Sequence, residues 1–276
     1  LAREALLKAE KTPAEETVIR IHLAQTGSFI AATRSPERNR AMLSAYEDLL
    51  AAIESARNQG DLRSASHGLG SLGALYAQDY GRIREAFFMT RQAILISEQA
   101  QAPDLTARWK AQLGDLHVSA GDLPSAISAY RTAVSLLELT RPEASPIYGS
   151  AEVAFRSAVE PIYRKLTELL LEASQSESDE SQRQARYSEA RNVIEQWKTA
   201  ELRSYFNDGC AADAQMVDLE TLDPSAAIVY PIPFEDRLEL LVSRSVGIEH
   251  FSVPVGEETL DAEVNRFRVN LGNQAS

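Results

Sequence analysis

Residues 227–255 read AIVYPIPFEDRLELLVSRSVGIEHFSVPV, and no other stretch of the chain has such clear β-strand character. It contains three short apolar runs in close succession: Ile228 to Tyr230, Arg237 to Ser243 and Ile248 to Val255. In the third run apolar residues recur with a period of two, which is typical of a half-buried strand. We therefore predict three short strands with tight connections.

The flanking residues set the expected limits of these strands. Pro231 and Pro233 are expected to close the first strand, because proline has no N–H for a ladder hydrogen bond. Turns are expected at Glu235-Asp236 and at 245–247, and a helix from Glu257. Three strands and one helix cannot bury both faces of a sheet, so residues 207–276 are interpreted as the first, incomplete part of a larger α/β domain.

The chain before this sheet is predicted to be helical. Thr12-Pro13 and Ser35-Pro36-Glu37 are helix-start signals, and Gly60 is a natural residue to end the second helix. An internal repeat follows, in which LGALY at 72–76 is matched by LGDLH at 113–117, 41 residues later. A period of this length indicates an array of helical pairs.

The repeat resembles a tetratricopeptide (TPR) repeat, and residues 1–140 are assigned to TPR-like helical hairpins. The second copy keeps the small and large residues of the family pattern, namely Leu113, Gly114, Gly121, Ala126, Tyr130 and Ala133. Small residues at these positions let two antiparallel helices approach closely. The helices from Glu37 are expected to form a degenerate repeat, with Gly60-Asp61 echoing Gly121-Asp122.

The TPR resemblance implies a superhelix whose concave face, lined by the first helix of each pair, takes a protein or peptide ligand. The groove positions expected on this basis are His67, Ala74, Gln78, Arg108, Asp115 and Val118. The alternative is that these residues only solvate a surface.

Residues 141–206 are predicted to be linker helices. RPEASP at 141–146 breaks the array, and Pro161 is expected to kink or split the helix that follows. Residues 173–184 are almost entirely polar and are predicted to form a mobile loop before a helix from Tyr187.

The order of the later segments resembles the entry to a CHAT domain, the caspase-like domain that follows TPR repeats in bacterial proteins. The segments are FRSAVEPIY at 155–163, LLL at 169–171, ARNVIE at 190–195, AELRSYF at 200–206, AIVYPI at 227–232 and DRLELLV at 236–242. The resemblance implies that the parent protein is a caspase- or separase-like cysteine peptidase. It also implies that the catalytic His and Cys lie beyond residue 276, so this chain alone is expected to be inactive.

Two other hypotheses stay open at this point. The first is a non-catalytic TPR scaffold for protein–protein interaction. The second is an oligomeric structural protein in which the open edge of the unfinished sheet pairs with another chain. The chain begins at Leu1 without a methionine and is expected to be a fragment.

The cysteine, the histidines and the glycines of the chain do not indicate a catalytic or phosphate-binding site. A dyad of Cys210 with His250 has the wrong order for the family, so Cys210 is expected to be a small buried thiol. His117 stands where the repeat usually packs an aromatic and is expected in the core. The glycines at 68, 70 and 73 do not follow a strand, and so they do not form a phosphate-binding loop.

Charge and composition exclude several classes of partner. The net charge is −12, and residues 205–276 carry 13 acidic residues against 4 arginines. Such a surface repels phosphate backbones, so no nucleic-acid partner is expected. One cysteine and four histidines do not favour a metal site, and no cofactor is expected. No stretch approaches the length of a membrane span, so we expect a cytoplasmic protein, with a secretion signal upstream of Leu1 left open.

Overall fold

The computed structural model describes residues 11–32, 37–79, 81–139, 158–206 and 225–274, and for 30–32, 203–206 and 271–274 the backbone only. The chain divides into two compact units, 1–165 and 166–276. The predicted break at 141–146 and Cys210 lie outside the described residues. The predicted three-part division at 140 and 206 stays a prediction.

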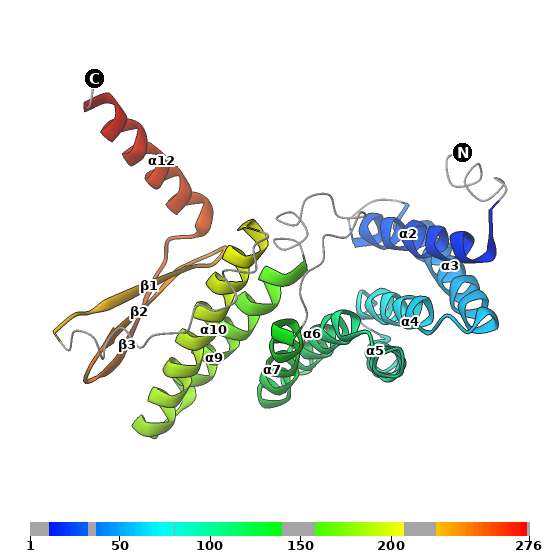
Figure 1. The fold of residues 1–276 in the computed structure, drawn as a ribbon, viewed down its shortest axis with the longest axis horizontal. Coiled ribbons are helices and arrows are strands. Elements are labelled where there is room, and N and C mark those ends of the chain that lie inside the picture. Colours follow the sequence, from blue (N-terminus) through cyan, green and yellow to red (C-terminus); the bar gives the residue numbers. More distant parts are fainter. Residues whose placement is uncertain (1–10, 33–36, 80, 140–157, 207–224, 275–276) are drawn as a thin grey trace. The chain divides into compact units, whose positions relative to one another are not determined.

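The first unit is a row of three antiparallel helical hairpins (Figure 1). They are α2 (Pro13–Ala32) with α3 (Arg38–Gln59), α4 (Leu62–Ala77) with α5 (Ile83–Gln99), and α6 (Pro103–Ser119) with α7 (Leu123–Leu139). Since α3 packs on α4 and α5 packs on α6, the hairpins stack in chain order. The unit is therefore a TPR-like repeat array, as the sequence predicts.

Two Gly-Asp pairs build the sharp turns of this array. Gly60 and Gly121 have φ values of 69° and 73°, a left-handed conformation that glycine adopts without steric cost. Asp61 and Asp122 then cap the next helix by accepting a backbone N–H three residues on, at 3.0 and 3.1 Å. The first pair joins two hairpins, whereas the second lies within one. The degenerate repeat therefore starts at Pro13, and not with the helix after Glu37.

Glycines allow α4 to touch three neighbouring helices. A Cβ at Gly68, Gly70 or Gly73 would lie 2.7 Å or less from an atom of the adjoining helix. The side chains that occupy this space are Ile53 of α3, Trp109 of α6 and Thr90 of α5. Gly114 of α6 accommodates the ring of Tyr130 on α7 in the same way. These close approaches explain why the repeat needs small residues here.

The core of the array is continuous across the hairpins. It consists mainly of buried aliphatic side chains around one indole: Leu49, Ile53, Leu69, Leu72, Leu75, Ile94, Trp109 and Leu116. Trp109 is 1% exposed, and its Nε1 donates to Ser66 Oγ at 3.0 Å.

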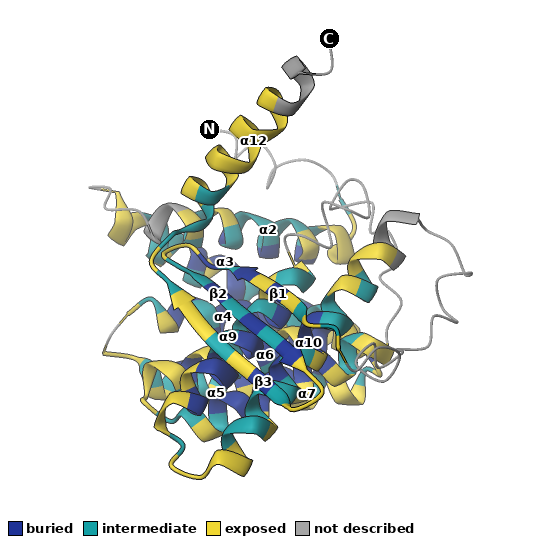
Figure 2. Ribbon diagram, turned by 90° about the vertical axis from the view of Figure 1, so that its left-hand side faces the viewer, coloured by how far each residue is buried: buried dark blue, intermediate teal, exposed yellow. Residues whose placement is uncertain are grey.

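The second unit is a small antiparallel sheet packed on helices (Figure 1). The strands β1 (Ile228–Pro233), β2 (Leu238–Arg244) and β3 (Gly247–Val253) lie in chain order. Helices α9 (Glu160–Ser176) and α10 (Glu180–Phe206) precede them, and α12 (Glu257–Gln274) follows. Burial alternates along the strands (Figure 2), so that one face, here called the inner face, is covered and the other, the outer face, is not.

The first strand is longer than predicted. It runs through Pro231 and Pro233, which pair with Leu240 and Leu238 of β2. The prediction that these prolines end the strand was wrong because β1 is an edge strand. In a strand, the backbone nitrogens of residues two apart face the same side. Both prolines therefore lack an N–H only on the side of β1 that has no neighbouring strand.

The predicted loop over 173–184 was also wrong. Helix α9 continues to Ser176 and α10 begins at Glu180, which leaves only three residues between them. Arg183 stabilises the start of α10. Its guanidinium donates hydrogen bonds to the Glu180 carboxylate and to the Glu177 carbonyl, both at 2.6 Å. Pro161 lies in the first turn of α9, where the missing N–H costs nothing.

Candidate functional site

The first helices of the three hairpins, α2, α4 and α6, lie next to one another. We call the surface that they form the first-helix face. Because the hairpins repeat every 41 residues, side chains about 41 positions apart meet across neighbouring first helices. This register brings polar residues of all three hairpins together.

A polar ladder, consisting of Gln25, His67 and Arg108, crosses the first-helix face. Gln25 Nε2 lies 3.0 Å from His67 Nε2, and Arg108 Nη1 lies 3.4 Å from the same nitrogen. One residue comes from each of α2, α4 and α6. His67 is therefore the centre of a contact that links the three hairpins.

These contacts determine the protonation state of His67. An arginine guanidinium can only donate hydrogen bonds, so the Nε2 that faces Arg108 must accept. The ring proton is then on Nδ1 and the imidazole is neutral. Burial, followed by the positive charge of Arg108, lowers the pKa of His67 to about 4.

One helical turn before the ladder, an ion pair joins the same two helices. Arg63 Nη1 donates to Asp104 Oδ1 at 3.1 Å, and Nη2 contacts Oδ2 of the same carboxylate. Both side chains are about half exposed. The pair aligns α4 with α6, and it leaves Asp104 engaged by Arg63 rather than by Arg108.

Arg108 differs from Arg63 in having no acidic partner within the described parts of the chain. Its contacts are the His67 ring and the indole of Trp109, 4.9 Å from the guanidinium. The residue is exposed. Arg108 thus presents a positioned cation on the first-helix face.

The other four predicted groove residues do not join the polar ladder. Asp115 is exposed and accepts a hydrogen bond from Tyr130 OH at 2.6 Å, while Val118 is exposed at the end of α6. Ala74 is half-buried on α4, at the position equivalent to Asp115. Gln78 follows the end of α4, where its carbonyl accepts from Arg38 Nη2 at 3.0 Å. Of the six predicted residues, the structure joins only His67 and Arg108 directly.

Sequence reasoning missed Gln25, Arg63 and Asp104. Arg63 and Asp104 are 41 residues apart, as are His67 and Arg108, so the repeat period could have found this pair. Gln25 lies 42 residues before His67 in a hairpin without the repeat motif, and no sequence signal pointed to it.

The remaining histidines do not form a catalytic arrangement within the described residues. His117, expected in the core, is half-buried: it packs edge-on against Phe87, with ring centroids 5.1 Å apart, and its Nδ1 lies 3.3 Å from Asp122 Oδ2. His250 Nε2 lies 2.7 Å from Glu239 Oε2, on the inner face of the sheet. The described residues also contain no group of three His, Cys, Asp or Glu side chains suited to a metal ion.

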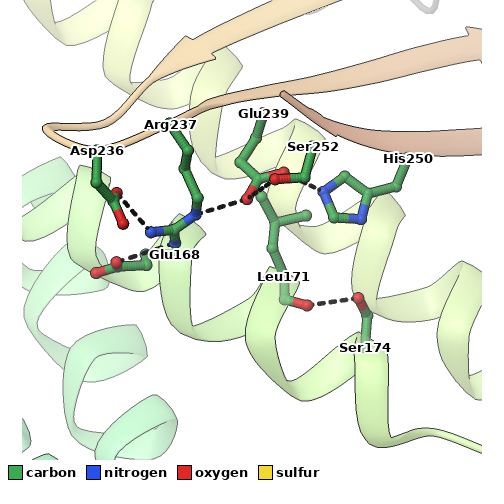
Figure 3. A network of polar contacts seen from close by, with 8 residues as sticks. All are labelled: Glu168, Leu171, Ser174, Asp236, Arg237, Glu239, His250 and Ser252. Carbon is green, nitrogen blue, oxygen red and sulfur yellow. Dashed lines mark hydrogen bonds and ion pairs between the residues drawn. The ribbon is translucent and has the colours of Figure 1, made fainter. Parts of the chain in front are cut away.

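Glu239 is the centre of a buried network between the sheet and the helices (Figure 3). The carboxylate is 2% exposed and contacts Arg237 Nε at 2.7 Å, His250 at 2.7 Å and Ser252 Oγ at 3.1 Å. Arg237 extends the network to Glu168 on α9 at 3.1 Å. Each of these side chains has at least one partner within the network, which therefore ties the sheet to α9.

Comparison with known proteins gives no family assignment. No protein-family model and no curated protein sequence matches the chain. One similar solved structure is the kinesin light chain protein of Podosopora anserina with nearly identical TPR-like repeats, at 16% identity and a TM-score of 0.38. The alignment covers 71% of this chain and 99% of that one.

A second similar structure is BtubC (BKLC) from P. vanneervenii, at 12% identity and a TM-score of 0.28, covering 80% of this chain and 99% of that one. These values are too low to transfer any property. The description of the array as TPR-like rests on its three hairpins and their 41-residue register. No helix in the described part of the chain combines the length and apolar character needed to cross a bilayer.

Proposed function

We propose that the chain is a protein-interaction scaffold whose first-helix face binds an extended segment of another protein. The observation that carries the proposal is the polar ladder, which links all three hairpins and presents Arg108 without an acidic partner in the described residues. Stacked hairpins give such a surface a length that a peptide can follow.

The chemistry of the ladder favours a ligand with a carbonyl or carboxylate at this point. Arg108 has N–H donors left over, and its stacking on Trp109 restricts its orientation before a ligand arrives. His67 is neutral and therefore does not add charge repulsion toward Arg108. An exposed arginine held over an aromatic ring is the kind of residue that dominates binding energy in interfaces.

The test is a selection of random linear peptides on the full chain, followed by affinity measurements on two variants. Arg108→Ala removes the exposed cation of the first-helix face. Arg91→Ala is the matched control, because Arg91 is exposed on α5 with its guanidinium 5.5 Å from the ring of Phe87. We expect the selected peptides to lose about tenfold or more in affinity for Arg108→Ala and to bind Arg91→Ala unchanged. Equal binding to both variants would exclude the first-helix face as the site.

We also propose, from the CHAT resemblance, that the parent protein is a cysteine peptidase of the caspase and separase type. In support, two of the segments that carry the resemblance, 227–232 and 236–242, overlap strands β1 and β2. The catalytic His and Cys are not among the residues matched, so the proposal assigns no catalytic role within this chain.

This second proposal has its own test. The chain is incubated with a broad peptide library under reducing conditions, alongside the Cys210→Ala variant. We expect no cleavage from either. Thiol-dependent cleavage that disappears in Cys210→Ala would show that the nucleophile lies within these residues and would contradict the proposal.

A further inference from the structure

Two donors of the polar ladder share a single acceptor. Nε2 of His67 lies 3.0 Å from Gln25 Nε2 and 3.4 Å from Arg108 Nη1. A neutral imidazole accepts through one ring nitrogen only, so Nε2 satisfies one of these donors well. The contact with Arg108 is the longer of the two and therefore the weaker. The ladder has one donor more than His67 can satisfy, and that donor belongs to the exposed guanidinium.

Basic groups outnumber acidic ones around His67. Arg108 and Asp104 act on it from α6, His22 from α2 and Arg63 from α4 itself. Helices α3 and α5 also pack on α4, but among the described residues neither adds a charged group to this set. Because Asp104 is paired with Arg63, the charge of Arg108 is not offset. Burial and this basic environment lower the pKa of His67 to about 4.

A ligand carboxylate at Arg108 would change both conditions. A carboxylate is a stronger acceptor for a guanidinium than a neutral ring nitrogen, so the donor of Arg108 would turn from His67 to the ligand. The negative charge of the ligand would also offset the positive charge of Arg108. Nε2 of His67 is then free to take a proton from the solvent, and Gln25 can accept this new N–H by turning its amide oxygen toward the ring.

We propose that the first-helix face binds an acidic segment of its partner together with one proton at His67, and so holds that segment more tightly as the pH falls. The inference rests on the binding role proposed for this face, and it adds the chemical class of the ligand and the pH control of binding. In the interval between the lower pKa of the free chain and the higher pKa of the complex, only the complex holds the proton. Proton and ligand therefore strengthen each other's binding by the same factor.

The test uses the full chain and linear peptides selected on it from a random library. Affinities are measured from about pH 7.5 to about pH 5.5, a range in which peptide carboxylates stay ionised. We expect the peptides to bind about fourfold more tightly at the lower pH, the gain that a pKa of about 6 in the complex would give. His67→Gln keeps an acceptor for Arg108, and its affinity should not change with pH. His22→Gln is the matched control and should keep the pH dependence.

Two modified peptides show which carboxylate reaches Arg108. In one, the acidic side chains are replaced by their amides, and in the other the C-terminal carboxylate is amidated. The modification that removes the group at Arg108 should lower the affinity and abolish its pH dependence, whereas the other should change neither. Full binding and full pH dependence after both modifications would overturn the assignment of an acidic ligand.

An NMR titration of His67 with and without a selected peptide measures the proton directly. The pKa of His67 should rise from about 4 toward about 6 in the complex. An unchanged pKa, an affinity that is constant with pH, or a pH dependence that survives in His67→Gln would overturn the proton uptake while leaving peptide binding intact. If no peptide binds, or if Arg108→Ala binds peptides as the natural chain does, the binding role of the face and this inference are both wrong.

Discussion

At the scale of single residues, His67 makes the folded array sensitive to acid. Its pKa is about 4 in the folded chain, against 6.5 for an ordinary histidine. Above pH 6.5 both states are neutral and the histidine has no effect on stability. Between pH 6.5 and 4 the unfolded chain takes up a proton that the folded chain does not, so stability falls as the pH falls.

We therefore expect His67→Gln to be less sensitive to acid than the natural chain. From pH 7 to pH 4 the natural chain should lose up to about 3 kcal/mol more unfolding free energy than the variant. The measurement is urea unfolding at both pH values. Parallel stability curves for the two proteins would contradict the assigned state of His67. As a second check, Arg108→Met should raise the pKa of His67 in an NMR titration.

Glu239 provides a residue-scale prediction for the second unit. Glu239→Ala removes the buried carboxylate shared by Arg237 and His250, although Arg237 keeps its ion pairs with Glu168 and Asp236. We expect a loss of about 3 kcal/mol in unfolding free energy. The control is Glu249→Ala, whose ion pair with Arg244 is about half exposed and should be worth at most about 1 kcal/mol. Similar losses in chemical denaturation would mean that the network is not a structural tie.

At the scale of helices and strands, close packing of α4 is the feature most easily tested. A Cβ at Gly70 would lie 2.5 Å from the buried indole of Trp109. Gly70→Ala should therefore destabilise the array by about 1–3 kcal/mol, despite the better helix propensity of alanine. Gly81→Ala, which meets only an Asp79 oxygen at 3.7 Å, should be nearly neutral. The thermal midpoints of the two variants decide the question.

The helices of the array could be predicted from sequence because their start and stop signals are local. Thr12-Pro13, Gly60 and Gly121-Asp122 each stand where a helix begins or ends. The polar stretch 173–184 was misread because it has no apolar periodicity. Its helical residues are held by ion pairs within α10 and by the bond of Gln184 to a strand 64 residues away, which no local pattern reveals.

At the scale of the whole molecule, the sequence predicts the order of a helical array and a small sheet. It also predicts that His67 and Arg108 belong to one face, because they are one repeat apart. It does not predict that Gln25 completes the ladder. The first hairpin lacks the repeat motif, so the sequence does not show which of its two helices lies beside α4. The uncovered outer face could not be predicted either, because the exposure of a strand face depends on what packs behind it.

Hydrogen–deuterium exchange of the full chain, with and without a selected peptide, tests the binding role of the first-helix face. The account predicts that the peptide slows exchange in α2, α4 and α6, centred near His67 and Arg108, and that Arg108→Ala abolishes this protection. Protection confined to α5 and α7, or to the unit from 166 to 276, would contradict it.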